Sequence, residues 1–328
     1  MADDRAVSGL RESSARGRDP VSRKGGAEAP ALVFERDFDA PYEKLIDVAP
    51  NIRRLLTRNP GPFTFKGTGV FVVGRGKAAV IDPGPDDPTH LDALRRALEG
   101  ESITHVLVTH THRDHSPAAK FLKSWTGAKT YGFGPQVRNQ RRQGPAVEEG
   151  GDTDFTPDVA VRDGDTIEGD GFRFISVHTP GHMSNHVCFA LESERALFSG
   201  DHVMGWSTSV VAPPDGDMAD YRASLKKLLD RDDVIYWPTH GGPVREPKLH
   251  VSALIGHRDE REAQILRALK DEARAIPEIV DRIYVGLDPR LKGAAGLSVL
   301  AHLLELIRNG RVVADGRANL SGRFRLAA

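Results

Sequence analysis

Residues 108–119 read VTHTHRDHSPAA and place three histidines and one aspartate within six positions. These side chains are His110, His112, Asp114 and His115. The chain has thirteen histidines among 328 residues, so random placement would rarely produce such a cluster. Neutral imidazole and carboxylate are ligands that zinc and similar divalent cations take in proteins. The stretch therefore predicts a metal site.

Metal-ligand residue types also follow three other strand-like runs. FISVHTPG leads to His182, ALFSG to Asp201 and VIYWPT to His240, as VLVT leads to the histidine stretch. Functional side chains commonly lie on loops at the edge of a rigid sheet, so we expect these four segments to meet there. Asp201 is the candidate bridge, because a carboxylate can bind two cations where one imidazole nitrogen binds only one.

The spacing within the histidine stretch suits two cations. His110 and His112 leave the strand together, whereas Asp114 and His115 follow in a tight turn and can face a second ion. Two cations about 3.5–4 Å apart can share a hydroxide and polarise the substrate oxygen that it attacks. The expected chemistry is therefore hydrolysis by a metal-bridging hydroxide, without a serine or cysteine nucleophile.

Hydrophobic patterns around these segments predict an α/β (α+β) fold. Residues 67–84, GTGVFVVGRGKAAVIDPG, read as a β-hairpin, and a helix, an apolar strand and a second helix follow. Four more strand-like runs follow residue 158, with an amphipathic helix at 218–230 before the last of them. The polar, glycine-rich segment 136–159 is predicted to be a long surface connection that flanks the site.

The C-terminal part has a different pattern. Residues 249–273 read as one long, charged helix, and two amphipathic helices and a short strand come after it, which together resemble a winged-helix unit. We expect three regions: a disordered leader at 1–30, a catalytic domain at 31–250 and a winged-helix-like domain at 251–328.

Composition limits the compartment and the partners. The formal net charge of −1 gives no chain-wide electrostatic attraction to nucleic acid or membrane. The longest apolar runs are far shorter than the roughly 20 residues of a membrane helix. A single cysteine, Cys188, excludes an internal disulfide, and the first 30 residues lack the apolar core of a secretory signal. We expect a cytoplasmic protein with no membrane partner, and a homodimer stays open.

The motifs HTHRDH, TPGH, SGD and PTHG resemble those of the metallo-β-lactamase superfamily over roughly residues 60–245. The resemblance implies an αββα sandwich with a binuclear site at one edge. It implies three sets of metal ligands: His110, His112 and His182 for the first metal, Asp114, His115 and His240 for the second, and Asp201 for both. It also implies that Asp82 supports the histidine loop. The expected cofactors are two Zn²⁺ per chain, with Mn²⁺ or Fe as alternatives, and Asp114 is assigned a catalytic role as acceptor of the hydroxide's hydrogen bond.

Sequences outside that region narrow the resemblance. HRDEREAQIL, EIVDRIY and AHLLELIRNGRV, with RNPGPFTFKGTG upstream, are similar to the β-lactamase-like protein 2 group, which appends a winged helix and includes a single-stranded RNA endoribonuclease. Two positions depart from the sequences of that group. Gly69 stands where asparagine is common, and the stretch SPAA, which contains Pro117, also differs. Both residues are expected to line the cleft.

Two substrate classes stay open for the predicted hydrolase. One is an ester, thioester or lactone, and the other is a phosphodiester in single-stranded RNA. Aromatic residues make up only 6% of the chain and strong basic runs are absent, which weighs against RNA. The alternative to an enzyme is a metal- and nucleic-acid-binding regulator, which the complete ligand set disfavours. A β-lactamase is disfavoured by the missing export signal.

Overall fold

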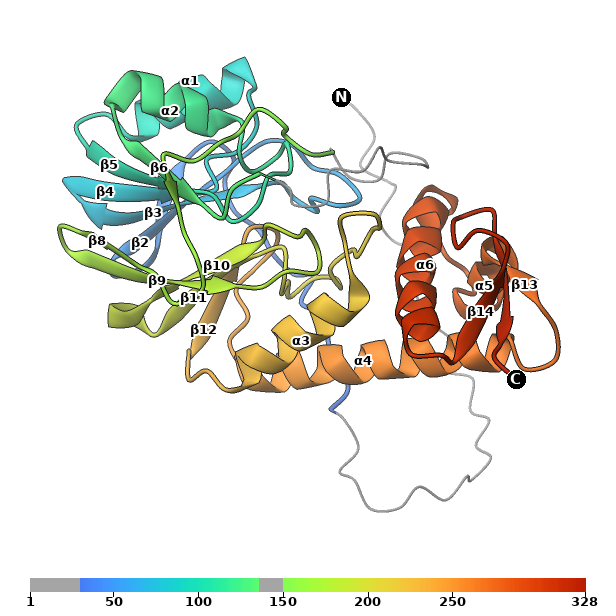
Figure 1. Cartoon of the computed structure of the whole chain (residues 1–328). Coiled ribbons are helices and arrows are strands. Elements are labelled where there is room, and N and C mark those ends of the chain that lie inside the picture. The colour runs from blue at the N-terminus through green and yellow to red at the C-terminus, as the bar shows by residue number, and fades with distance from the viewer. Residues whose placement is uncertain (1–29, 136–149) are drawn as a thin grey trace.

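The structure is a computed structural model that describes residues 30–135 and 150–328. The predicted leader up to residue 29, and residues 136–149 of the predicted surface connection, lie outside these ranges. Two sheets pack face to face with helices on both outer faces, and a smaller unit follows at the C-terminus (Figure 1). The predicted αββα sandwich is confirmed.

Among the described residues, seven strands form the first sheet and are neighbours in chain order. They are β1 (Leu45–Ala49), β2 (Ile52–Leu56), β3 (Gly69–Arg75), β4 (Lys77–Ile81), β5 (Ser102–Leu107), β6 (Lys129–Gly132) and β7 (Val159–Ala160). Strands β1 to β4 pair antiparallel, and β4 to β7 pair parallel. Parallel neighbours need crossover connections, and α1 (Pro88–Ala97) and α2 (Ala118–Thr126) supply two of them and cover the outer face (Figure 1).

The second sheet has the order β12-β11-β10-β9-β8. These strands are β8 (Thr166–Gly169), β9 (Phe172–His178), β10 (Val187–Leu191), β11 (Ala196–Gly200) and β12 (Ile235–Pro238), with a 3₁₀ turn at Glu192–Glu194. Strand β12 pairs parallel to β11, and α3 (Met218–Leu229) is the crossover between them. Helices α3 and α4 (Pro247–Ala268) cover the outer face of this sheet (Figure 1).

Aromatic side chains fill the space between the two sheets. Phe71 of β3 contacts Phe198 of β11 edge to face, with ring centroids 5.2 Å apart, and Phe174 of β9 also packs on Phe198. All three rings are buried. Such a core fixes the relative position of the two sheets, and with it the position of the loops that leave their strands.

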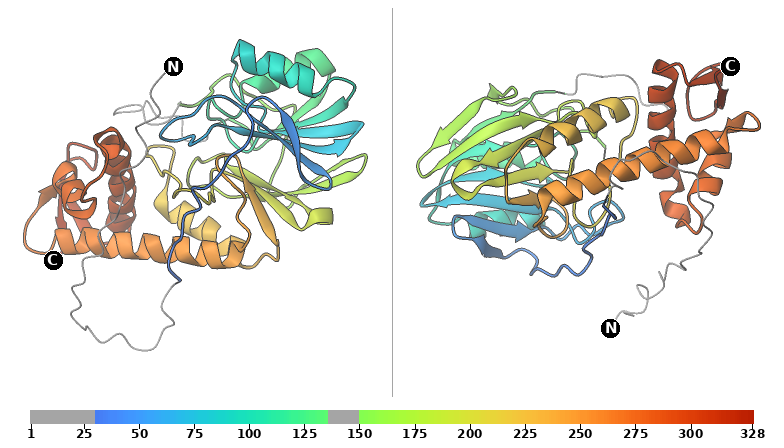
Figure 2. Two further views of the ribbon diagram at one scale, coloured as in Figure 1. Left: turned by 180° about the vertical axis from the view of Figure 1, so that it is seen from behind. Right: turned by 90° about the horizontal axis from the view of Figure 1, so that it is seen from below.

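Helix α4 connects the sandwich to the C-terminal unit (Figure 2). That unit contains β13 (Arg274–Ala275), α5 (Ile276–Ile283), a 3₁₀ turn (Pro289–Leu291), α6 (Lys292–Arg308), β14 (Val312–Asp315) and β15 (Arg323–Leu326). Its own core packs α5 and α6 against the end of α4 and the small sheet. The predicted domain boundary at residue 250 falls inside α4. No helix in the described ranges is long and apolar enough to cross a bilayer.

Candidate metal site

The seven predicted ligands come from loops that follow four strands. The loop after β5 carries His110, His112, Asp114 and His115, and the remaining three are placed by other strands. These three are His182 after β9, Asp201 after β11 and His240 after β12. All seven side chains are buried, and the structure brings them together in three overlapping groups. The seven residues that the sequence singled out thus lie close together, and their binding of metal stays a prediction.

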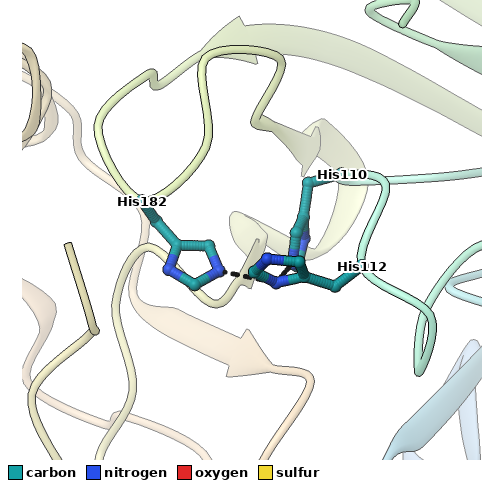
Figure 3. Close-up of side chains that lie close together, drawn as sticks. All are labelled: His110, His112 and His182. Carbon is teal, nitrogen blue, oxygen red and sulfur yellow. Dashed lines mark hydrogen bonds between the residues drawn. The ribbon is translucent and has the colours of Figure 1, made fainter. Parts of the chain in front are cut away.

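Three histidines form the first group, and their rings point toward one another (Figure 3). Nδ1 of His112 lies 3.0 Å from Nε2 of His110 and 3.1 Å from Nε2 of His182. Burial and the neighbouring imidazoles hold the pKa of His110 and His112 well below the ordinary value. Both rings are therefore neutral at physiological pH, as metal ligation requires.

Hydrogen bonds at the far side of these rings fix which nitrogen faces the centre. Nδ1 of His182 donates to the Val210 carbonyl oxygen at 2.7 Å. Nδ1 of His110 donates to Thr109 Oγ1 at 3.0 Å, because that hydroxyl gives its own hydrogen to Asp82. Both Nε2 atoms consequently present lone pairs to the centre.

The second group consists of Asp114, His115 and His240. Asp114 Oδ2 lies 3.3 Å from Nε2 of His115 and 3.0 Å from Nε2 of His240. Asp201 Oδ2 lies 3.6 Å and 3.4 Å from the same two nitrogens, and 4.0 Å from Nε2 of His182 in the first group. One oxygen of Asp201 is thus close to ligand nitrogens of both groups.

Opposite charges set the titration of the second group. Burial lowers the pKa of His115 and His240, but the surrounding carboxylates outweigh it and raise the pKa of His240 to about 10. Burial raises the pKa of Asp114 and Asp201, yet His115 and His240 lower it by more. Both carboxylates are therefore ionised, and a divalent cation would replace the protons that the two imidazoles hold without metal.

Asp82 joins the loops of both sheets beneath the cluster. Its Oδ1 accepts from the Thr109 amide at 2.8 Å. Its Oδ2 accepts from the hydroxyls of Thr109 and Thr239 at 2.8 and 2.7 Å, and from Nδ1 of His115 at 3.0 Å. Asp82 is thus hydrogen-bonded to the histidine loop, and the bond from Nδ1 of His115 leaves Nε2 of that ring facing the centre.

The donor set fits divalent cations. His112 Nδ1 carries one hydrogen at most, so it can make a well-directed hydrogen bond to only one of the two Nε2 atoms that lie 3.0 and 3.1 Å from it. Three imidazole nitrogens gathered this closely are favourable when a cation lies among them. Nε2 of His115 and Oδ1 of Asp201 are buried with no hydrogen-bond partner among the described residues. Buried polar atoms rarely lack a partner, so a bound cation would account for these two atoms by taking them as ligands.

Sequence reasoning missed several residues that hold the ligands. Thr109 and Thr239 each stand directly before a ligand histidine and each bond Asp82. The repeated Thr-His pair at two strand ends was the available signal. Conversely, the expectation that Gly69 lines the cleft is wrong, because the space that its side chain would occupy is filled by the Arg54 guanidinium. Pro117 does line a pocket, of about 270 Å³, on the α2 side of the metal loop.

Comparisons with known proteins agree with this geometry. Residues 64–240 match the Metallo-beta-lactamase superfamily, and residues 275–321 match the Beta-lactamase associated winged helix domain. The chain belongs to the metallo-β-lactamase superfamily, whose fold usually binds metal ions and whose members are generally hydrolases. The match to the associated winged helix follows the αββα sandwich in the chain.

Several individual proteins are similar to the chain over most of its length. The chain is 31% identical to the Beta-lactamase-like protein 2 homolog of Caenorhabditis elegans, over 83% of this chain and 88% of that protein. It is 29% identical to the Atrochrysone carboxyl ACP thioesterase dmxR1 of Cryptosporiopsis sp., over 72% of this chain and 69% of that protein. The crystal structure of a Beta-lactamase domain protein from Burkholderia ambifaria superposes with a TM-score of 0.72 at 20% identity, covering 90% of this chain and 98% of that one. That likeness concerns the fold alone.

Proposed function

We propose that the chain is a two-zinc hydrolase that cleaves thioesters. The observation that carries the proposal is the position of Asp201 Oδ2, within 4.0 Å of ligand nitrogens from both groups. In this assignment, Asp201 would hold both cations. His110, His112 and His182 would hold the first, and Asp114, His115 and His240 would hold the second. Imidazole with carboxylate suits zinc, while Mn²⁺ and Fe are the alternatives that metal analysis would reveal.

Cations bound there would acidify a coordinated water and polarise the carbonyl oxygen under attack. The chain's residues supply the rest of the site. Asp114 stays ionised because His115 and His240 lower its pKa, so its carboxylate can accept a hydrogen bond from the attacking water. Thr68 Oγ1 donates to Asp114 Oδ2 at 3.5 Å and helps to hold that carboxylate in place. Asp114 and Thr68 are both buried, which limits the water that competes for their hydrogen bonds.

Thioesters are favoured over phosphodiesters for two reasons. Four relatives of 28–30% identity are named as atrochrysone carboxyl ACP thioesterases, and their substrate class is transferred here as part of the proposal. The residues before His257 carry a formal net charge of −4, and phosphate backbones bind to positive surfaces. Cleavage of single-stranded RNA, suggested by the resemblance to the β-lactamase-like protein 2 group, is the second outcome that the experiment distinguishes.

A parallel substrate panel tests the proposed function. The zinc-loaded full chain is given an acyl N-acetylcysteamine thioester, a lactone, bis-p-nitrophenyl phosphate and a single-stranded RNA. The metal-stripped chain and the His110→Ala variant serve as blanks. We expect kcat/KM for the thioester to exceed that for the phosphodiester by at least about a hundredfold, or about 2.7 kcal/mol in activation free energy. A preference for RNA or bis-p-nitrophenyl phosphate, or thioester cleavage that survives in both blanks, would refute it.

A further inference from the structure

Arg54, in the middle of β2, is buried and lies beside the second group of ligands. Its Nη1 donates to the Gly241 carbonyl oxygen at 2.7 Å, and its Nη2 donates to the Thr239 carbonyl oxygen at 3.3 Å. These two carbonyls belong to the residues immediately before and after His240. The Arg54 guanidinium therefore forms hydrogen bonds to the main chain on both sides of the candidate ligand His240.

The Arg54 guanidinium is a buried charge with no acidic partner among the described residues. It stacks over the rings of Phe38 and Phe71, at 4.6 and 5.3 Å from their centroids. Burial lowers its pKa to about 10, so it is still a cation at neutral pH. An unpaired buried charge is strongly unfavourable unless hydrogen bonds and ring faces compensate for it. Here the compensating oxygens are those that flank His240.

The backbone at Gly69 leaves the space that the Arg54 side chain occupies. A Cβ atom at Gly69 would lie 2.3 Å from Nε of Arg54, so a larger residue there would displace the guanidinium. The Gly69 amide also donates to the Thr239 carbonyl at 2.8 Å. On the other side, the Gly67 carbonyl accepts from Nδ1 of His240 at 3.1 Å. The backbone around His240 and its ring are thus fixed by separate contacts, with Arg54 at the centre.

We propose that Arg54 is a positioning residue for the second metal subsite. By holding the carbonyls of Thr239 and Gly241, it keeps Nε2 of His240 directed at Asp114 and Asp201. The proposal deepens the two-metal function and rests on it for the presence of a second cation. Residues that orient metal ligands without touching the metal typically change affinity by about 10- to 100-fold when replaced.

The adjacent residue offers a matched control. Arg53 is also buried on β2, but successive strand residues face opposite sides of the sheet. It donates to the Gly74 carbonyl at 2.7 Å and pairs with Glu101 at 2.6 Å, and neither partner is a predicted ligand or lies next to one in the chain. Arg53→Met removes a buried arginine of the same strand without touching the His240 segment.

The experiment is a Co²⁺ titration of the metal-free full chain, followed by the visible absorption of bound cobalt, for wild type, Arg54→Met, Arg54→Lys and Arg53→Met. We expect the second Co²⁺ to bind Arg54→Met about 10- to 100-fold more weakly, with the first unchanged. Arg54→Lys keeps the charge but reaches only one carbonyl, so its loss should be intermediate. Arg53→Met should bind two ions as wild type does. Circular dichroism checks that each variant folds. If Arg54→Met does not fold, the affinity of Arg54→Lys for the second Co²⁺ tests the proposal.

Three results would overturn the proposal: wild-type affinity for the second ion in the Arg54 variants, equal weakening of both ions, or the same selective loss in Arg53→Met. A wild-type chain that binds only one Co²⁺ would also overturn it. If wild type binds two metals yet cleaves no thioester, the proposed function fails while the role of Arg54 is still decided by the titration.

Discussion

Replacing Asp201 with asparagine is expected to lower kcat/KM for thioester hydrolysis by at least about a thousandfold, which corresponds to about 4 kcal/mol of transition-state stabilisation. The amide keeps the shape of the side chain but loses the negative charge and one ligand oxygen. Because Asp201 Oδ2 is the atom close to both groups, the substitution should weaken both subsites together. Steady-state kinetics and metal analysis of the same preparation measure the two effects.

Asp233→Asn is the control for this substitution. Asp233 lies just before β12, at the end of the strands opposite to Asp201, and its side chain is also buried. It pairs with Arg231 at 2.6 Å, so its loss should lower stability without changing metal content or rate. An Asp201→Asn protein that keeps two metals and wild-type kcat/KM would contradict the assignment of the bridge.

Asp82→Ala is expected to lower the free energy of unfolding by about 3 kcal/mol or more and to reduce the metal content. The substitution removes the common acceptor of Thr109, His115 and Thr239 and leaves their buried donors without it. Each buried donor left unsatisfied costs about 1–3 kcal/mol, and the effects of neighbours are not additive. His115 also loses the hydrogen bond that directs its Nε2 toward the centre. Urea unfolding and metal analysis provide the measurements.

Asp87→Ala is the control, because it removes another aspartate from the same loop without removing a hydrogen bond to the histidine stretch. Asp87 caps α1 by accepting from the amides of Thr89 and His90. Loss of an N-cap typically costs about 1 kcal/mol, so stability should fall modestly while two metals stay bound. If Asp82→Ala unfolded no more readily than Asp87→Ala and kept its metals, Asp82 would not be the support that its hydrogen bonds indicate.

The candidate ligands could be picked out from the sequence because metal chemistry restricts residue types and spacing. His110, His112, Asp114 and His115 are a dense local pattern, and the other three recur after apolar strands. Arg54 has no such signature. Its role depends on two carbonyls more than 180 positions away in the chain, which only the pairing of distant loops brings near. An arginine within IRRLL reads equally well as a solvent-facing side chain.

The same limit applies to parts of the fold. The hairpin of β3 and β4 and helices such as α1 and α5 follow from clear hydrophobic periodicity, whereas α4 was predicted as one long, charged helix. Strand β2 was not predicted, since Arg53 and Arg54 interrupt its apolar pattern and are buried only through distant partners. Strand β1 was not predicted either. The short strands β6 and β7 were also missed, because two to four residues carry too little periodicity to be recognised.

The central claim is that one carboxylate joins two cations, and anomalous diffraction from crystals of the zinc-loaded full chain tests it most directly. We expect two zinc peaks per chain, about 3.5–4 Å apart, with Asp201 contacting both. The first peak should lie among His110, His112 and His182, and the second at Asp114, His115 and His240. A single peak, or two peaks of which Asp201 contacts only one, would contradict it.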